Sequence, residues 1–537
     1  MQARALGTIR NVLFCKNGRF GPTITWILRK FSAKKVTKCK EPKTKGTFKQ
    51  CTITDNMVDP CRPEPSIVII GAGIAGLSVA QRLSQCGLNK FTVLEATERP
   101  GGRIHSCWLG DVVAEMGCQW IHGASIGNPV YTLAAQEGLL KTPLKRIDFS
   151  KGLYLTSDGR AIDQATAMMA YHVFAQIKRE AASLFTMGCG KEHGSLLNFL
   201  SLRIQQELQK FAEEQRYEVS RILYGLSQRV RFLAGEDLSR VSADNFGSYI
   251  SIPGGSVQIP LGFVGVLSPL LKDLPECSVK FGKPVGLIRW GSVQGHKKGG
   301  PRAVVQCCDG EEYCADYVVI TVSLGVLKEH AEKMFCPALP ANKMDAIKCL
   351  GYGNIDKIFL DYEKPFWVWS EGGIKFAWSP DELSHRNDWT KGLVSVEEVE
   401  GSRHVLCAFI CGPEAVVMEQ ASDEEVAEGI TRVLRQFTGD ASLPYPCTIL
   451  RSKWASDPYF CGAYSYMNVT SNVGHQCDLS CPVPGSCDPV PPILLFAGEA
   501  TSAGYHSTVH GARVSGVREA ERIVQLTKKF AGPPPPL

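Results

Sequence analysis

No stretch of the 537-residue sequence approaches the roughly 18 consecutive apolar residues that a membrane-spanning helix requires, so we expect no integral membrane segment. A secretory signal is lacking too, because the candidate apolar core near the N-terminus, "ITWIL", is too short. The 21 cysteines therefore predict reduced thiols in an intracellular protein, where disulfides seldom persist.

An excess of basic charge occurs only at the N-terminus. Residues 1–40 hold ten Lys or Arg and no Asp or Glu, and the other 49 basic residues are outnumbered by 53 acidic ones. The rest of the chain lacks the basic field that nucleic-acid binding needs, so we predict no nucleic-acid partner. The acid-free segment is typical of a mitochondrial transit peptide or of a basic disordered tail. We expect a cytoplasmic protein, with mitochondrial and peroxisomal locations as alternatives, although the final "PPL" lacks the basic middle residue of a peroxisomal tripeptide.

Metal-ligating residue types are densest in "HQCDLSCPVPGSC", which contains His475, Cys477, Cys481 and Cys487. Their spacing fits no paired C-x-x-C pattern of a zinc site. We predict no bound metal, with zinc at these four residues as the alternative.

A strand–helix–strand unit is predicted to open the ordered part of the chain, near Pro65. The apolar run "SIVII" at 66–70 predicts a buried strand, "GLSVAQRLSQCG" has helical spacing, and "FTVLEA" at 91–96 predicts a second strand. The unit spans about 30 residues, the size that a parallel crossover requires.

The segment "GAGIAG", between the first strand and the helix, has the glycine spacing of a dinucleotide-binding turn. Gly71 permits the tight turn, Gly73 lets the backbone approach a pyrophosphate, and Gly76 allows close packing of helix on strand. Unpaired N–H groups at the helix N-terminus would face the phosphates. Glu95, at the end of the second strand, would accept hydrogen bonds from a ribose. The sequence therefore predicts a bound dinucleotide.

Two further segments favour FAD over NAD. Paired glycines let the backbone approach a second part of the cofactor, and an arginine can face phosphate or a flavin carbonyl. "ERPGGRIHS" supplies Gly101, Gly102 and Arg103, and "FAGEATSAGYHSTVHGA" supplies Gly498, Glu499 and Thr501.

Eight ordered motifs over about residues 65–525 resemble those of the flavin amine oxidases, and within them the polyamine oxidase group that includes spermine and acetylpolyamine oxidases. The motifs are "VIIGAGIAGL", "LEATERPGGR", "EMGCQWIHG", "GKPV", "VVITVSLGVLK", "DKIFLDYEKPFW", "RSKWASDPYFCGAYSY" and "LLFAGEATSAGYHSTVHGA". The resemblance implies an α/β protein in which a Rossmann-type FAD-binding domain is interleaved with an α+β substrate domain. We expect the FAD-binding domain at 65–135, 255–330 and 490–528, the substrate-binding domain at 136–254 and 331–489, a basic extension at 1–64 and a Pro-rich tail at 529–537.

The resemblance also implies a non-covalent FAD. Monoamine oxidases tether the flavin through a cysteine whose place is taken here by Ala463, although Cys461 is close by. The implied cofactor-binding residues are Gly71, Gly73, Ala75, Gly76, Glu95, Gly102, Arg103, Gly117, Trp120, Val285, Trp454, Gly498, Glu499, Thr508 and Val509.

Lys357 lies in the β-rich run "NIDKIFLDYEKPFW" at 354–367. Alternation places Ile358 and Leu360 on one face and Lys357 beside Phe359 on the other. From this run alone, Lys357 would extend from a strand end to solvent. The resemblance implies instead that it is catalytic and holds a water against the flavin, where burial would lower its pKa. On that basis, Lys357→Met should leave fold and stability almost unchanged.

The substrate-binding residues implied by the resemblance are His122, Tyr464, Tyr505 and His506. His122, in "WIHG", would lie beside the substrate amine and count as catalytic. The alternative is a core histidine whose hydrogen bonds are satisfied.

Four positions depart from the polyamine oxidase pattern. Arg229 and Arg231 lie near the place of a glutamate, Ser248 replaces the acid of an "FGE" motif, and His506 replaces a tyrosine. Cations near the substrate would oppose a polycation, because like charges repel strongly where water is excluded.

The implied activity is oxidation of a secondary amine in a polyamine or N-acetylpolyamine. Dioxygen would accept the electrons, and an aldehyde, a shorter amine and hydrogen peroxide would form. We expect a monomer. The alternatives are a flavin oxidase of methyl-lysine or a monoamine, or a catalytically idle flavoprotein. The sequence leaves no room for the coiled-coil tower and N-terminal helical module of histone demethylases.

Overall fold

The computed structural model of the chain describes residues 63–110, 112–141, 143–148, 150–291, 301–367, 372–384, 388–485 and 490–534. Residues 1–62, which include nearly all of the expected basic extension, lie outside the described residues, as does Cys487.

A five-stranded parallel sheet contains the predicted strand–helix–strand unit. Its order is β21 (Leu494–Phe496), β12 (Tyr317–Ile320), β1 (Ile67–Ile70), β2 (Phe91–Leu94) and β8 (Val279–Lys280). All four residues of β1 are buried, as expected for an apolar strand covered on both faces. The predicted strands at 66–70 and 91–96 are confirmed.

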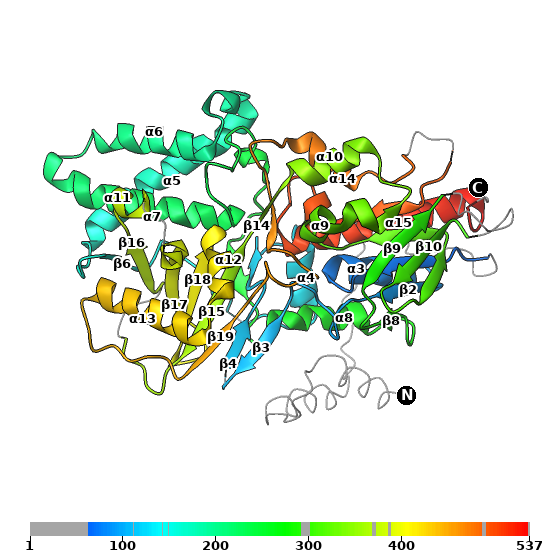
Figure 1. Cartoon of the computed structure of the whole chain (residues 1–537), viewed down its shortest axis with the longest axis horizontal. Coiled ribbons are helices and arrows are strands. Elements are labelled where there is room, and N and C mark those ends of the chain that lie inside the picture. Colours follow the sequence, from blue (N-terminus) through cyan, green and yellow to red (C-terminus); the bar gives the residue numbers. More distant parts are fainter. Residues whose placement is uncertain are drawn as a thin grey trace, which may run out of the picture.

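Two helices, α3 (Ile74–Gln85) and α15 (Val509–Phe530), pack against each other beside this sheet (Figure 1). They approach so closely that a Cβ on Gly516 would lie 2.2 Å from the carbonyl oxygen of Ala75.

A second sheet has six strands, and Lys357 lies in one of its inner strands. Its order is β19 (Thr448–Arg451), β15 (Ile355–Asp361), β18 (Val405–Cys411), β17 (Leu393–Glu398), β16 (Ile374–Ala377) and β6 (Leu153–Thr156). On one face Ile358 and Leu360 join a core that includes apolar residues of α13 (Asp423–Thr438). On the other, Phe359 joins a separate core with Trp454. Both faces of β15 are therefore buried, and the expected alternation is confirmed.

Three long helices pack against one another: α5 (Gln164–Met187), α6 (Leu196–Leu208) and α7 (Glu213–Ala234). The Asp163 carboxylate accepts the N–H of Thr166 at the start of α5, and Gly188 ends that helix with a left-handed φ of 67°.

Smaller elements join these parts. A four-stranded sheet has the order β11 (Glu312–Ala315), β10 (Ala303–Cys307), β9 (Val285–Trp290), β13 (Phe335–Cys336), and the strand pairs are β3 (Ser106–Leu109) with β4 (Val112–Glu115), β5 (Trp120–His122) with β7 (Ser256–Gln258), and β14 (Gly351–Gly353) with β20 (Tyr464–Tyr466). The other α-helices in the described residues are α4 (Pro129–Gln136), α8 (Ser268–Leu271), α9 (Leu324–Met334), α10 (Ala341–Cys349), α11 (Pro380–Ser384), α12 (Pro413–Gln420) and α14 (Val473–Ser480).

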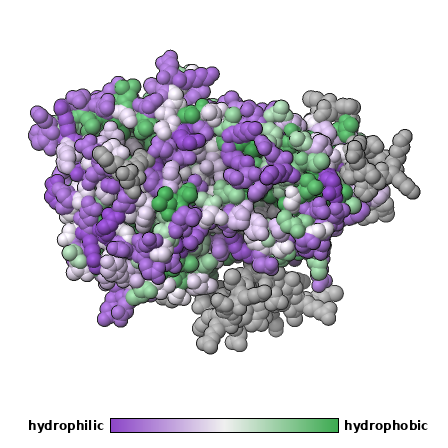
Figure 2. Space-filling view, in the orientation of Figure 1, coloured by the Kyte–Doolittle hydropathy of each residue, from purple (hydrophilic) through white to green (hydrophobic). Residues whose placement is uncertain are grey.

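Segments that build the two large sheets alternate along the sequence, but the strands of each sheet come together in one part of the molecule. In Figure 1, α3, α15, β2 and β8 lie on the right, and α5, α6, α7 and the six-stranded sheet lie on the left. The strands of the two sheets fall within the ranges expected for the two domains, whose boundaries stay a prediction. The face in Figure 2 is mainly hydrophilic with small separate hydrophobic areas, and no described helix has the length and apolar character to span a bilayer.

The glycines of the first turn provide a test of the fold. A Cβ on Gly76 would lie 2.0 Å from the carbonyl oxygen of Gly71, whereas a Cβ on Gly73 would meet only the carbonyl oxygen of Gly101, at 4.0 Å. We expect Gly76→Ala to lower the free energy of unfolding by about 3 kcal/mol, because the backbone must shift to relieve the clash. Gly73→Ala should change it by less than about 1 kcal/mol. Urea unfolding of both variants measures the difference, and equal effects would contradict the packing role of Gly76.

Candidate active site

One large cavity, of about 1400 Å³, is lined by residues of both large sheets and of helices α5 and α7. Its volume exceeds the roughly 300–1,000 Å³ of a site for one drug-sized ligand. The cavity therefore has room for a long cofactor together with a substrate.

The first end of the cavity is built from the glycine turn. Gly71 has a φ of 106°, which turns the chain from β1 into α3, and Gly73 is the N-cap of α3 without a side-chain cap. The N-terminus of α15 also reaches the cavity, at Val509. The N-terminus of α3 thus lies where the sequence predicts phosphates, and its N–H groups can face them. The N-terminus of α15 reaches another part of the lining, with the Gly511 N–H donated to Thr508 Oγ1 at 3.0 Å.

Glu95 is buried at the end of β2, beside the glycine turn. One carboxylate oxygen accepts the N–H of Ala72 at 2.7 Å, and the other accepts the N–H and hydroxyl of Thr97 at 2.9 and 2.8 Å. The carboxylate lines the cavity and has further lone pairs, so it can also accept a ribose hydroxyl. Glu95 therefore fixes the turn as well as facing the cavity.

Arg103 and Glu499 tie together the segments that line the middle of the cavity. The Arg103 guanidinium donates to Glu499 at 3.1 Å and to the carbonyl oxygen of Ala463 at 2.7 Å. The Glu499 carboxylate also accepts the hydroxyl of Ser465 at 2.6 Å and the N–H of Ser507 at 2.7 Å. Both side chains therefore hold parts of the cavity wall together, in addition to any contact with a ligand.

Lys357 points inward from β15 and lines the cavity. Its Nζ donates to the carbonyl oxygens of Glu115 and Gly117, both at 2.8 Å, and to the side-chain oxygen of Gln119 at 2.9 Å. Burial lowers the pKa of the amine. The solvent-exposed alternative is thus wrong. All three protons of the charged form are donated to protein oxygens, while the neutral form has a lone pair that can take a proton.

His122 lies at the end of β5 with its side chain open to the cavity. Its Nδ1 is 2.9 Å from the hydroxyl of Ser256, which lies opposite on β7. Desolvation by the surrounding cavity wall lowers the pKa of the imidazole, which favours the neutral ring, although part of the residue is open to solvent. The alternative of a closed-off core histidine does not fit this position.

Most other expected site residues also line the cavity: Ala75, Gly102, Gly117, Trp120, Val285, Trp454, Gly498, Thr508, Val509, Tyr464 and His506. Tyr505 is not among the lining residues, since its ring packs edge-on against His510 with centroids 5.4 Å apart. Gly76 is outside the lining as well, because it packs α3 on the turn.

Two of the departing residues are placed differently from what the sequence indicates. Arg231 is buried away from the cavity, where its guanidinium donates to Glu414 at 2.6 Å and to Gln228 at 2.8 Å. Ser248 is buried outside the lining. Arg229 and His506 do line the cavity, so only these two departures bear on a ligand there.

Three residues that the sequence did not predict also line the cavity: Lys178 from α5, Glu397 from β17 and His510 from α15. Lys178 could have been found by helical spacing, since it lies seven residues after Tyr171 on the same face of α5. Glu397 gave no comparable signal, because its position depends on the pairing of β17 with β18.

Unpartnered polar atoms and open space in the cavity also fit a bound FAD. Within the described residues, His506 Nδ1 and His510 Nε2 are buried without a hydrogen-bond partner, and both residues line the cavity. Gly498, with a φ of 128°, has nothing within 4 Å of where a Cβ would be. A long ligand with a central anion and polar groups at both ends would satisfy these features.

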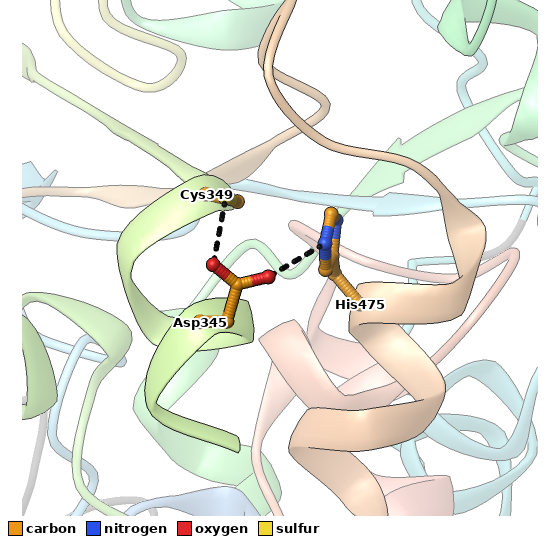
Figure 3. A group of neighbouring side chains, drawn as sticks. All are labelled: Asp345, Cys349 and His475. Carbon is orange, nitrogen blue, oxygen red and sulfur yellow. Dashed lines mark hydrogen bonds and ion pairs between the residues drawn. The ribbon is translucent and has the colours of Figure 1, made fainter. Parts of the chain in front are cut away.

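A separate group of possible metal ligands lies between α10 and α14 (Figure 3). The Asp345 carboxylate accepts a hydrogen bond from the Cys349 thiol at 3.7 Å, and its other oxygen lies 3.4 Å from His475 Nε2. His475 Nδ1 accepts the N–H of Asn472 at 3.1 Å, so in the neutral ring Nε2 carries the proton. Nε2 then lacks the lone pair that a metal needs. Within this group, the contact between α10 and α14 is the ion pair of Asp345 with His475.

The cavity wall predicts how FAD is attached. Ala463 has no thiol, and the thiol of Cys461, which is not a lining residue, contacts the carbonyl oxygen of Pro458 at 3.4 Å. We expect the purified protein to be yellow and to release intact FAD on denaturation with acid or heat. Absorbance of the supernatant measures the released flavin. Flavin that stays with the precipitated chain would contradict non-covalent binding.

Comparisons with known proteins identify the family of this chain. Residues 74–524 match the family model described as flavin containing amine oxidoreductase. The chain is 38% identical to the peroxisomal N(1)-acetyl-spermine/spermidine oxidase of Homo sapiens over 86% of this chain and 95% of that protein. It is 28% identical to lysine-specific histone demethylase 1 homolog 1 of Oryza sativa subsp. japonica over 88% of this chain but 54% of that protein. A solved structure of a redesigned putrescine oxidase has the same fold, with a TM-score of 0.63 and 20% identity over 86% of this chain and 99% of that one. The chain belongs to the flavin-containing amine oxidoreductase family.

Proposed function

We propose that this enzyme oxidises a secondary amine in a polyamine or N-acetylpolyamine, with FAD as cofactor and dioxygen as electron acceptor. The observation that carries the proposal is that the buried amine of Lys357 and the ring of His122 line one cavity that fits FAD, where the Trp120 ring lies near both, 5.8 Å from Lys357 Nζ and 6.2 Å from the His122 ring centroid. The 38% identity to a peroxisomal N(1)-acetyl-spermine/spermidine oxidase supports the substrate class.

A bound FAD would supply hydride-accepting chemistry at the carbon next to the amine nitrogen, with dioxygen as the final electron acceptor that becomes hydrogen peroxide, and water would hydrolyse the imine to an aldehyde and a shorter amine. The protein must hold the amine close by and keep it neutral. Desolvation lowers the pKa of His122, which favours the neutral ring that can accept a proton from the substrate ammonium.

The walls beside Lys357 attract and orient an amine. Glu397 offers a carboxylate that accepts the Ser395 hydroxyl at 3.0 Å, and the rings of Trp120 and Phe409 lie parallel enough to stack, with centroids 5.8 Å apart. An ammonium is stabilised by a carboxylate and by aromatic faces. These groups support binding of the charged part of the substrate near the reacting carbon.

A panel of amines tests this proposal. Spermine, spermidine, their N-acetyl forms, monoamines and methyl-lysine peptides are offered to the flavin-loaded enzyme, and hydrogen peroxide is measured. Peroxide from polyamines or acetylpolyamines is expected. Peroxide from monoamines or methyl-lysine alone would overturn the substrate class, and no peroxide from any amine would favour the idle flavoprotein.

Lys357→Met tests the catalytic wall. We expect turnover to fall by roughly 10²–10⁴, the usual range for a positioned acid–base group. The contacts correct the expectation from sequence that stability stays unchanged: three buried oxygens lose their donor, which costs about 1–3 kcal/mol in free energy of unfolding. Anaerobic mixing with substrate and then with dioxygen separates the two half-reactions.

Lys343 offers a matched control outside the cavity. Its buried Nζ donates to the carbonyl oxygens of Asp478, Leu479 and Cys481 at 2.7, 2.8 and 2.7 Å. Lys343→Met should lose a similar amount of stability while the flavin-loaded fraction keeps its turnover. Normal rates of both half-reactions in Lys357→Met, or an equal loss in Lys343→Met, would remove Lys357 from the mechanism.

We also propose a cytoplasmic, monomeric enzyme. The near balance of charge outside residues 1–40 supports a protein without a nucleic-acid partner. Two relatives are named as peroxisomal, so the peroxisome is the alternative location. A full-length fluorescent fusion tests which compartment holds the protein.

A further inference from the structure

The three oxygens that bind the Lys357 amine differ in how they can respond when the amine loses a proton. Two are main-chain carbonyl oxygens, of Glu115 and Gly117, and the third is the side-chain oxygen of Gln119. A carbonyl oxygen can only accept a hydrogen bond, whereas a glutamine side chain has an oxygen that accepts and an NH2 group that donates. Of the three partners, Gln119 alone can therefore bond to either form of the amine.

The two carbonyl groups are fixed by the backbone around them. Glu115 is paired with Ser106 in the ladder of β3 and β4. The Gly117 N–H donates to the carbonyl oxygen of His105 at 3.3 Å, and a Cβ on Gly117 would lie 1.8 Å from the carbonyl oxygen of Arg103. Neither carbonyl can turn away from the amine unless the main chain moves.

The Gln119 side chain is held less tightly. It lines the cavity, and within the described part of the chain its hydrogen bond is the one that its oxygen accepts from Lys357 at 2.9 Å. An ammonium group has only donors, so the amide oxygen faces it. A turn of the amide group would bring its NH2 to the amine without breaking a bond to any other described residue.

A neutral Lys357 amine needs such a donor. It keeps two N–H groups, which the fixed carbonyls can accept, and it has a lone pair where the third proton was. The rings of Trp120 and Phe409, with centroids 5.8 and 5.7 Å from Nζ, favour a cation and have no donor on their faces. A buried polar group without a partner lowers stability, so the neutral form requires that Gln119 turn.

The other titratable groups near Lys357 do not bond to its amine. Besides burial, Cys407, Glu115, Cys118 and Glu397 act on its charge. Burial raises the pKa of both thiols, that of Cys407 to about 12, so neither is charged at neutral pH. Both carboxylates accept hydrogen bonds from other groups, and among the described residues no bond joins any of these four side chains to Nζ.

We propose that Gln119 is a positioning residue that serves both protonation states of Lys357: its oxygen accepts from the ammonium, and after the amide turns, its NH2 group donates to the neutral amine. The proton that leaves is the one that points to Gln119, since the other two stay on fixed carbonyl oxygens, and water in the cavity receives it. The inference rests on the proposed amine oxidase function, in which Lys357 handles a proton.

Gln119→Glu and Gln119→Leu test the two roles in the flavin-loaded enzyme. The titration midpoint of Lys357 is read by NMR from the Cε chemical shift of isotope-labelled lysine, and its signal is assigned by its loss in Lys357→Met. Flavin reduction by spermine and by N1-acetylspermine is followed without oxygen over the same pH range. Flavin content and unfolding temperature show whether each variant is folded and loaded.

Glutamate accepts but does not donate and carries a negative charge, so Gln119→Glu should raise the midpoint by about 1–3 units. Below the wild-type midpoint the neutral fraction, and with it the reduction rate, should fall about ten-fold for each unit and recover as the pH rises. Leucine serves neither form of the amine. Gln119→Leu should move the midpoint by less than about one unit and lower the rate about ten-fold at every pH, the effect of one lost hydrogen bond on the position of Lys357.

Gln258→Glu is the matched control, because Gln258 lies opposite Trp120 in the pair of β5 and β7 but not in the cavity lining. It makes the same chemical change outside the cavity and should leave the rate unchanged and the midpoint within about half a unit of wild type.

An unchanged midpoint in Gln119→Glu, or a wild-type rate in Gln119→Leu, would overturn the role of Gln119 and leave amine oxidation intact. A midpoint lowered by more than about one unit in Gln119→Leu would show a partner of the ammonium only and overturn the dual role. An absence of flavin reduction by every amine in wild type would overturn the proposed function, while the Lys357 midpoints would still decide whether Gln119 serves both forms.

Discussion

The burial of one amine, that of Lys357, is the constraint on which the arrangement of this cavity depends. The amine is removed from water, so its protons must be donated to protein oxygens, and these come from the segment between β4 and β5. The next strand, β5, carries Trp120 and His122. Lys357, on the six-stranded sheet, is thereby tied to the segment that leads to His122, another residue of the cavity lining.

The part of the cavity that fits the cofactor is likewise held together by hydrogen bonds between distant segments. Glu95 ties the glycine turn to the end of β2, and the pair Arg103 and Glu499 joins segments that are 396 residues apart. These polar groups are buried and mutually bonded, so the wall is rigid before a ligand binds.

The sequence predicted the parts of the site that lie within single motifs. The turn at Gly71 and the carboxylate at Glu95 follow from strand and helix patterns in contiguous residues. The inward position of Lys357 and the interleaved fold were instead implied by the resemblance to the amine oxidases, because the run around Lys357 alone favours a lysine that reaches solvent.

What the sequence could not predict depends on packing between distant segments. Arg231 looked like a cation opposing the substrate, but Glu414, 183 residues later, pairs with it in the core. Tyr505 and His506 are adjacent, yet only His506 lines the cavity, and Ser507 next to them has a φ of 64°. Neither placement can be read from residue types or spacing, because the partners are brought together only by the folded chain.

A crystal structure of the flavin-loaded enzyme tests the central claim, that one cavity joins the glycine turn to Lys357 and holds the cofactor between them. We expect electron density for FAD that runs from Gly73 to the wall formed by Lys357 and Trp454, with the lysine amine still buried. Density for FAD at another place, or a Lys357 side chain turned to solvent, would contradict it.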